Sequence, residues 1–181
     1  GSGDDAINGG SGTDFLYGEG GADTIYGGYD KDKIWGGSEG DTIHGEHGND
    51  VLYGGTGGDS LYGGDGDDYL IGEEGADTLY FADGIDRLFG GTGADTFHVE
   101  NGSGNDNDMA YAYDFNAGEG DVINVSDLLS GFTQGVDDIT DFVNVAQGSN
   151  TTIQIDRDGA GSTYGWDNVL RLQGNTSLNT D

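Results

Sequence analysis

The stretch Gly54-Gly55-Thr56-Gly57-Gly58-Asp59-Ser60-Leu61-Tyr62 decides the fold, because the chain repeats this pattern every nine residues. The frame runs without a slip from Gly9 to His98, and a partial copy fills residues 1–8. The copy Gly9-Gly10-Ser11-Gly12-Thr13-Asp14-Phe15-Leu16-Tyr17 keeps the same glycines. A fixed period of this kind indicates a solenoid, in which each copy packs mainly against its neighbours.

Two positions of the nine never change in kind along the repeat. The sixth position is aspartate in all eleven copies, at Asp5, Asp14, Asp23, Asp32, Asp41, Asp50, Asp59, Asp68, Asp77, Asp86 and Asp95. The eighth position is always apolar, at Ile7, Leu16, Ile25, Ile34, Ile43, Leu52, Leu61, Leu70, Leu79, Leu88 and Phe97. The pattern therefore predicts that every copy buries its eighth-position side chain and presents a carboxylate at its sixth position.

The arrangement of these positions follows from strand geometry. Positions seven to nine suit a short strand with position eight pointing inward, and the Gly-rich remainder suits a tight turn with unusual dihedral angles. Two copies complete one coil, so strands eighteen residues apart stack at roughly 4.8 Å. Asp5, Asp23, Asp41, Asp59, Asp77 and Asp95 then stack on one side, and the remaining aspartates of the ladder stack on the other.

The predicted core is too thin to stabilise this fold alone. Each copy buries about one large side chain, worth roughly 1.5–3 kcal/mol, whereas ordering nine residues costs roughly 1–2 kcal/mol each. Stacked carboxylates add repulsion, and a divalent cation between turns reverses it. Carboxylate and carbonyl oxygens suit Ca²⁺, whereas Mg²⁺ keeps its waters. About nine gaps between stacked aspartates predict up to about nine Ca²⁺ ions and a chain unfolded without them, in preference to a metal-free solenoid.

Composition narrows the alternatives. The chain of 181 residues has 35 Asp+Glu against 5 Lys+Arg, a net charge of -30, 39 Gly and no Cys or Pro. Such charge would suit an acidic disordered tail, but aromatic residues make up 10% and the apolar residues keep the repeat frame. The scarcity of Lys and Arg argues against nucleic acid as a partner. No apolar run is long enough to predict a transmembrane segment. Without Cys, no disulfide can hold the fold together.

The nine-residue pattern resembles the calcium-binding repeat of the RTX (repeats-in-toxin) β-roll. The resemblance implies that one turn supplies carbonyls from positions two and four plus its Asp, and the next coil supplies positions one and three plus its Asp. The implied ligands are Gly1, Gly3, Asp5, Gly10, Gly12, Asp14, Gly18, Gly20, Gly21, Asp23, Gly27, Gly28, Tyr29, Asp30, Asp32, Gly36, Gly37, Ser38, Glu39, Asp41, Gly45, Glu46, His47, Gly48, Asp50, Gly54, Gly55, Thr56, Gly57, Asp59, Gly63, Gly64, Asp65, Gly66, Asp68, Gly72, Glu73, Glu74, Gly75, Asp77, Phe81, Asp83, Asp86, Gly90, Thr92 and Asp95. Copy 81–89, which lacks its leading Gly pair, fits this set least.

The second half of the chain has a different pattern. Alternating apolar runs at residues 109–115, 122–125, 139–145, 151–155 and 169–172 predict β-strands, and Ser126 suits the cap of a short helical turn. We predict an all-β chain, with a right-handed parallel β-roll over residues 1–98 and a small β-rich capping domain over residues 99–181. Several segments, including Tyr113 to Asp121 and Thr152 to Gly159, resemble the C-terminal region of type I secreted bacterial RTX adhesins.

That resemblance implies a calcium-dependent folding and stabilising module of a large adhesin. Such a module is exported unfolded through the type I secretion channel, folds outside the cell and catalyses nothing. We expect the chain to lack the final export signal. Upstream domains would contact an extracellular glycan or a host or cell surface. The alternative is the β-roll module of a secreted epimerase, protease or lipase that assists polysaccharide binding.

Weaker patterns remain open. Asp156, Asp158 and Asp167 partly match an EF-hand loop, although a predicted strand and not a helix precedes them, and Asp106 to Asp108 could form another calcium site. Outward strand positions predict a Thr/Tyr/His face that either binds glycan or ice or, more simply, suits exposed strands. The opposite face carries aromatic residues and could contact a partner. The three histidines are expected to be structural, and no unique carboxylate pair indicates a glycosidase.

Overall fold

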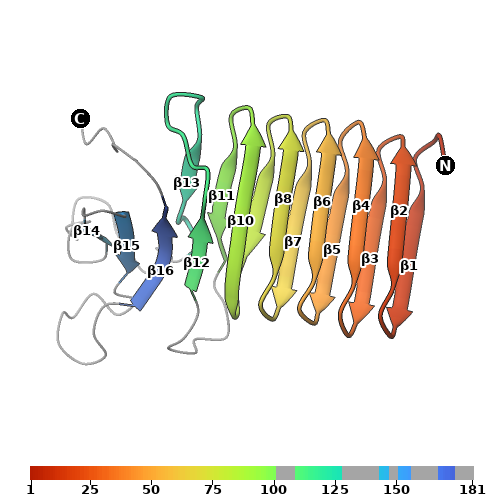
Figure 1. Ribbon diagram of the computed structural model, residues 1–181, viewed down its shortest axis with the longest axis horizontal. Helices are drawn as coiled ribbons and strands as arrows, with labels where there is room; N and C mark the ends of the chain where they lie inside the picture. Colours follow the sequence, from red (N-terminus) through yellow and green to blue (C-terminus); the bar gives the residue numbers. More distant parts are fainter. Residues whose placement is uncertain (101–108, 128–142, 147–150, 156–166, 174–181) are drawn as a thin grey trace.

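The computed structural model describes residues 1–100, 109–127, 143–146, 151–155 and 167–173, and its core is a solenoid of parallel strands (Figure 1). The strands of the repeat region are β1 (Ala6–Ser11), β2 (Phe15–Gly20), β3 (Thr24–Tyr29), β4 (Lys33–Ser38), β5 (Thr42–His47), β6 (Val51–Thr56), β7 (Ser60–Asp65), β8 (Tyr69–Glu74), β9 (Thr78–Phe81), β10 (Ile85–Thr92) and β11 (Thr96–Val99). Odd-numbered strands form one sheet and even-numbered strands the other. Each coil of the solenoid therefore contributes one strand to each sheet.

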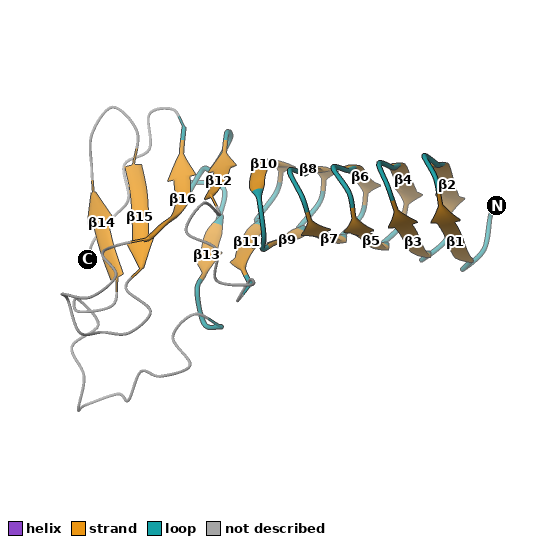
Figure 2. Ribbon diagram, turned by 90° about the horizontal axis from the view of Figure 1, so that it is seen from below, coloured by secondary structure: helices purple, strands orange, loops and turns teal. Residues whose placement is uncertain are grey.

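The register between coils is eighteen residues, as the nine-residue frame predicts. Ile25 of β3 pairs with Ile43 of β5, and Ile34 of β4 pairs with Leu52 of β6, both in parallel. Figure 2 shows the coils following one another along the axis, with loops joining the two sheets. The all-β parallel β-roll predicted from the sequence is confirmed.

The strands are longer than the three residues that the sequence suggested. Strand β4 continues beyond Trp35 through the next two glycines, since Gly37 pairs with Gly55 and Ser38 with Thr56. The glycines of positions one and two therefore belong to the strands. Only positions four to six form the turn, such as Glu39, Gly40 and Asp41. The physical reason is that the parallel backbone ladder carries on wherever neighbouring coils stay in register.

The core is a single file of eighth-position side chains between the two sheets. These side chains are fully buried from Ile25 to Phe97, whereas Ile7 and Leu16 at the N-terminal end are only partly buried. The predicted core positions are thus confirmed, and the core is one side chain wide. Such a core leaves much of the stabilisation to the turns.

Later segments extend both sheets beyond the repeat. The strands are β12 (Met109–Ala112), β13 (Val122–Asn124), β14 (Val143–Ala146), β15 (Thr151–Ile155) and β16 (Asp167–Leu172). Strand β12 pairs in parallel with β10, β13 with β11, and β16 with β12. Strands β14 and β15 pair antiparallel. Leu170 and Leu172 of β16 are fully buried and continue the core past the last repeat.

Strands occur within or overlapping all five alternating runs of the second half. Ser126 and Asp127 form a turn, whereas residues 128 and 129 of the expected helical turn lie outside the described residues. Among the described residues, no helix has the length and apolar character that a membrane crossing requires.

Candidate metal centres

The sixth-position aspartates form two continuous ladders inside the turns. In each ladder the Oδ1 atom of one aspartate accepts the backbone amide of the aspartate one coil earlier. Asp32 donates to Asp50 at 2.7 Å, and Asp50 donates to Asp68 at 2.8 Å. Asp50 and Asp68 have no exposed surface. Each carboxylate is thus fixed in direction by the coil that precedes it.

The second carboxylate oxygen of these residues is buried without a hydrogen-bond donor. The Oδ2 atoms in this state include those of Asp14, Asp23, Asp32, Asp41, Asp50, Asp59, Asp68 and Asp77. A buried charged oxygen without a partner is costly. A cation supplies the missing partner, so the described residues fit bound Ca²⁺.

The missing side chain of the first-position glycine leaves the space in which oxygen atoms converge. A Cβ atom on Gly9 would lie 2.7 Å from Asp14 Oδ2 and 2.7 Å from the Gly27 carbonyl oxygen. One coil later, a Cβ atom on Gly27 would lie 2.6 Å from Asp32 Oδ2 and 2.9 Å from the Gly45 carbonyl oxygen. The carboxylate of one coil and the first-position carbonyl of the next therefore face the same small volume. Hard oxygen atoms from two coils are the donor set that Ca²⁺ prefers.

Burial changes the protonation of the ladder. Desolvation raises the pKa of Asp41 and Asp50 to about 6, against the lowering effect of the backbone hydrogen bond that each accepts. The same cause raises the pKa of Asp68 and Asp77 to about 7. Neighbouring carboxylates raise these values further. A bound cation opposes both effects, because it stabilises the ionised form.

Among the described residues, five non-glycine residues have a positive φ, and all of them are acidic. Glu19, Asp30, Glu39, Glu46 and Glu73 have φ between 72° and 79°. In the structure they adopt the left-handed region, which non-glycine residues occupy only at a cost. The turns therefore keep their shape at these positions.

Copy 81–89 differs from the others. The side chain of Phe81 is buried in the core, and its carbonyl oxygen accepts the Glu100 amide at 2.9 Å. The first-position carbonyl that a regular copy offers to the ion is therefore engaged elsewhere. Of the implied ligands, Phe81 fits the metal set least, because its copy starts without the glycine pair.

Asp121 continues one ladder, although the sequence frame had already stopped. Its Oδ1 accepts the Asp95 amide at 3.0 Å, as Asp95 Oδ1 accepts the Asp77 amide at 3.0 Å. Its Oδ2 accepts the Asn116 amide at 2.7 Å, in contrast to the repeat aspartates. The nine-residue frame does not predict this role, because the frame ends at His98. The available signal was Asp121-Val122-Ile123-Asn124, which repeats positions six to nine after a turn of irregular length.

Asp114 caps the last turn of the repeat. Its carboxylate accepts the amides of Gly90 at 3.0 Å and Gly91 at 2.9 Å. Burial raises the pKa of Asp114, although both amides lower it. Together with Asp121, this residue therefore accepts backbone amides of the last repeat copy, at Gly90, Gly91 and Asp95.

Most of the weaker sequence candidates fall outside the part of the chain that the structure describes. Asp156, Asp158 and residues 106–108 lie outside the described residues, and Asp167 is the first residue of β16, paired with Ile155. His47 Nδ1 lies 2.7 Å from Asp65 Oδ2 at an exposed turn. His98 Nε2 lies 3.1 Å from Asp127 Oδ2. Within the described ranges, no three His, Cys, Asp or Glu side chains converge as in a side-chain metal site.

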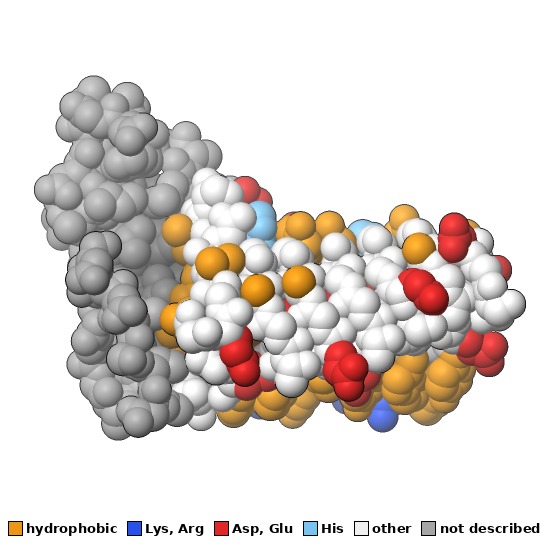
Figure 3. All heavy atoms as spheres, turned by 90° about the horizontal axis from the view of Figure 1, so that it is seen from above, with side chains coloured by type: hydrophobic (Ala, Val, Ile, Leu, Met, Phe, Trp, Pro, Cys, Tyr) orange, Lys and Arg blue, Asp and Glu red, His pale blue; other side chains and the backbone are white. Residues whose placement is uncertain are grey.

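The outward strand positions form stacked ring ladders. On the odd-numbered sheet, the ring centroids of Tyr26, His44, Tyr62, Tyr80 and His98 follow one another at 4.1–4.7 Å. On the other sheet, Trp35 stacks between Tyr17 and Tyr53, and Lys33 Nζ lies 5.0 Å from the Trp35 ring. Figure 3 shows hydrophobic side chains along both outer margins of the roll and acidic side chains in separate groups between them.

A protein-family model agrees with this geometry. The model of the RTX calcium-binding nonapeptide repeat (4 copies) matches residues 1–28, 26–61, 44–79, 53–88 and 82–112, more than half of the chain. A search of curated proteins gave no match. Among solved structures, the AlgE6R3 subunit of the Azotobacter vinelandii mannuronan C5-epimerase is 25% identical, over 80% of this chain and 71% of that chain, with a TM-score of 0.40. With oxygen atoms from successive coils directed at common points and the repeat matched from residue 1 to 112, this chain belongs to the RTX calcium-binding nonapeptide repeat family.

Proposed function

We propose that this chain is a calcium-dependent folding and stabilising module near the C-terminus of a large secreted bacterial RTX adhesin. It crosses the type I export channel unfolded and folds when extracellular calcium fills its turns. It performs no catalysis itself. The observation that carries the proposal is the ladder of buried Asp Oδ2 atoms that accept no hydrogen bond.

Calcium can act as a folding trigger because each ligand set joins two coils. Asp14 and the Gly27 carbonyl belong to successive coils of one side, so an ion held by both fixes their stacking. Without ions, a chain of net charge -30 repels itself, and its one-residue-wide core cannot offset that repulsion. Binding free energy therefore becomes folding free energy. In a cytoplasm with little free calcium, such a chain stays unfolded and can be exported.

The adhesin assignment rests on the segment after the repeat. Residues Tyr113 to Asp121 resemble the C-terminal region of secreted RTX adhesins, and the same segment supplies Asp114 and Asp121 to the last turn. Its position supports a role in closing the roll. In an exported adhesin, the C-terminal end leaves the channel first, so a cap at this end gives the coils a surface on which to fold.

The test is circular dichroism of the purified chain during calcium titration. We expect a disordered spectrum in EDTA and a strand spectrum with calcium, reversed by chelation and not reproduced by equal magnesium. Retention of the full strand signal and thermal transition after metal removal would contradict the proposal. For the adhesin role, the test is deletion of residues 1–181 from the parent gene. We expect the deletion to abolish surface adhesion, and we expect the parent protein to show no enzymatic activity before or after it.

The alternative function is a β-roll module that helps a secreted enzyme bind polysaccharide. The observation that favours it is the regular outer array of Thr24, Thr42, Thr78 and Thr96 beside stacked Tyr and His rings. In those stacks the rings face one another, which supports a structural role more than a sugar platform. Calcium-loaded protein on a glycan array distinguishes the two: saturable polysaccharide binding by this chain supports the enzyme module.

A further inference from the structure

The backbone amide at position four of the turn has two kinds of acceptor along the roll. In the C-terminal coils it donates to the third-position carbonyl oxygen one coil later. These bonds run from Gly48 to Asp65, Gly57 to Glu74, Gly66 to Asp83 and Gly75 to Thr92, at 2.8–3.1 Å. The implied calcium ligands include the third-position carbonyl oxygens, so the acceptor that this amide uses bears on the calcium sites.

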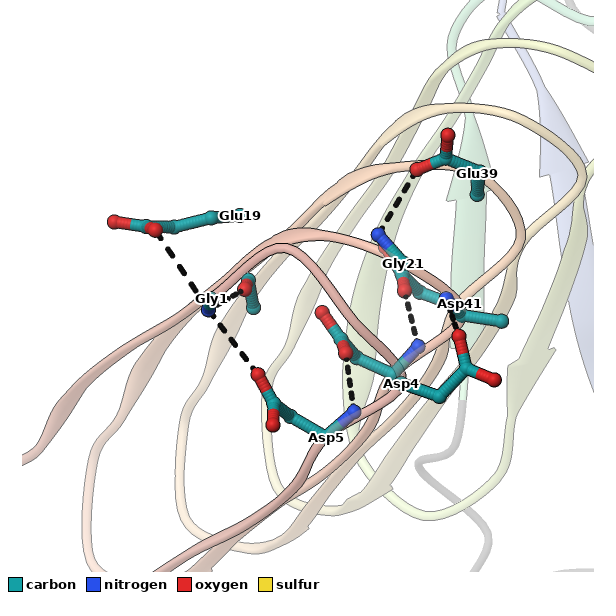
Figure 4. Close-up of polar contacts among 10 residues, drawn as sticks. Gly1, Asp4, Asp5, Glu19, Gly21, Glu39 and Asp41 are labelled. Atoms are coloured by element: carbon teal, nitrogen blue, oxygen red, sulfur yellow. Dashed lines mark hydrogen bonds and ion pairs between the residues drawn. The ribbon is translucent and has the colours of Figure 1, made fainter.

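At two N-terminal turns, those of Gly12 and Gly21, the acceptor is a side chain. Gly12 donates to Asp30 Oδ2 at 3.2 Å, and Gly21 donates to Glu39 Oε2 at 2.9 Å. The Ser38 hydroxyl also donates to Glu39 Oε2 at 2.9 Å. Figure 4 shows the Glu39 carboxylate reaching back over the turn to Gly21. Asp30 and Glu39 thus replace the carbonyl oxygens of Tyr29 and Ser38 as acceptors.

Both acidic residues hold a backbone conformation that glycine adopts more easily. The φ angles of Asp30 and Glu39 are 73° and 72°, in a region that costs a non-glycine residue free energy. The regular pattern places glycine here. A side-chain contact that glycine cannot make gives a physical reason for the departure.

We propose that Asp30 and Glu39 are positioning residues for the calcium sites between Asp14 and Asp32 and between Asp23 and Asp41. Each carboxylate holds the amide of the preceding turn, which leaves the third-position carbonyl oxygen free to offer both lone pairs to the ion. The inference rests on calcium binding by the turns. It gives a function to two side chains that the nine-residue pattern treats as deviations.

The experiment compares Glu39→Gly with Glu46→Gly. Glu46 has the same positive φ of 73° but, within the described residues, its carboxylate accepts no backbone amide. Both variants remove one acidic charge and one strained residue, and only the first removes the contact. Glu39→Gln keeps an acceptor oxygen and serves as the conservative variant. All are made with Trp166→Phe, so that Trp35, in the strand that ends beside Glu39, reports alone.

We expect the calcium midpoint of Trp35 fluorescence to rise roughly two- to tenfold in Glu39→Gly relative to Glu46→Gly, the equivalent of one hydrogen bond. Glu39→Gln should fall between the two. Amide exchange of Gly21, measured by NMR with calcium bound, should accelerate in Glu39→Gly and not in Glu46→Gly. Equal midpoints and equal Gly21 exchange in both variants would overturn the positioning role.

The outcomes separate this inference from the proposed function. If Trp35 of the parent chain does not respond to calcium, calcium-dependent folding itself is wrong. If the parent responds and the two glycine variants coincide, calcium-dependent folding stands and only the role of Glu39 fails. The same comparison with Asp30→Gly tests the other side of the roll.

Discussion

At the scale of single residues, one aspartate serves two purposes. Oδ1 of Asp68 accepts the Asp50 amide at 2.8 Å and fixes the carboxylate, and Oδ2 remains buried without a donor. The amide bond alone does not need a charge, since an Asn oxygen could accept it. The negative charge of Asp68 is therefore available to bind a calcium ion. Because the two oxygens have separate roles, a substitution that removes only the charge should separate the backbone contact from calcium binding.

We expect Asp68→Asn to retain the amide contact and to weaken calcium binding, because one carboxylate ligand becomes a neutral amide. The loss should be about tenfold or more in calcium midpoint, or about 1.4 kcal/mol. Isothermal titration calorimetry and the calcium midpoint of the strand signal measure it. Glu74→Gln is the control, since it removes an equal charge from an exposed side chain at the opposite end of β8. Equal effects of both substitutions would show that only total charge matters.

At the scale of elements, the end of the roll is built from an irregular turn. Strand β13 pairs with β11 in the register of a further coil, yet Asp121 follows Asp95 by twenty-six residues and not eighteen. Both Asp121 oxygens accept amides, so this carboxylate is satisfied by the chain itself. The ladder thus ends on a residue that needs no further coil. Such a cap protects the last rung, as the terminal units of repeat proteins do.

Replacement of Asp121 by Ala should destabilise the C-terminal rungs more than the N-terminal ones. It leaves the amides of Asp95 and Asn116 without their acceptor, at a cost of about 1–3 kcal/mol. Hydrogen exchange at saturating calcium should accelerate in β11 and β13 and remain unchanged in β3 and β5. Glu119→Ala, an exposed change in the same turn, is the control. A uniform loss of protection along the roll would contradict a local cap.

At the scale of the whole molecule, proton and calcium compete for the same buried carboxylates. The pKa of Asp41 and Asp50 is about 6 and that of Asp68 and Asp77 about 7 in the metal-free fold, above the ordinary 3.8, because burial disfavours the charge. A raised pKa in the fold means that the fold binds protons more tightly than the unfolded chain. Its contribution to stability is complete below about 3.8 and disappears as the pH rises through 6 to 7.

In EDTA, the chain should therefore gain strand signal as the pH falls from about 7 to about 4. With calcium, the midpoint should rise as the pH falls, because the ion must displace these protons. Circular dichroism over a grid of pH and calcium concentration measures both effects. High potassium chloride at pH 7 is the control, since it screens exposed charges without adding protons to the buried carboxylates. A calcium midpoint independent of pH would contradict the coupling.

The sequence by itself determined the repeat, the eighteen-residue coil, the inward apolar line and the two aspartate ladders. These follow from a strict period, since every copy occupies the same environment and a pattern such as Gly54 to Tyr62 has one consistent arrangement. The adhesin assignment and the ligand positions remain predictions, because they concern domains and ions beyond the folded chain.

Only the tertiary structure decided how far each strand continues into the glycines, which oxygen of each Asp remains without a donor, and where the ladder stops. Asp121 stands outside the period, and Asp30 and Glu39 depart from the pattern, so periodicity gave no guide to their partners. Their contacts join coils that are distant in sequence, through side-chain directions set by the stacked backbone. Local propensity cannot specify such contacts, because they exist only once the coils lie one on another.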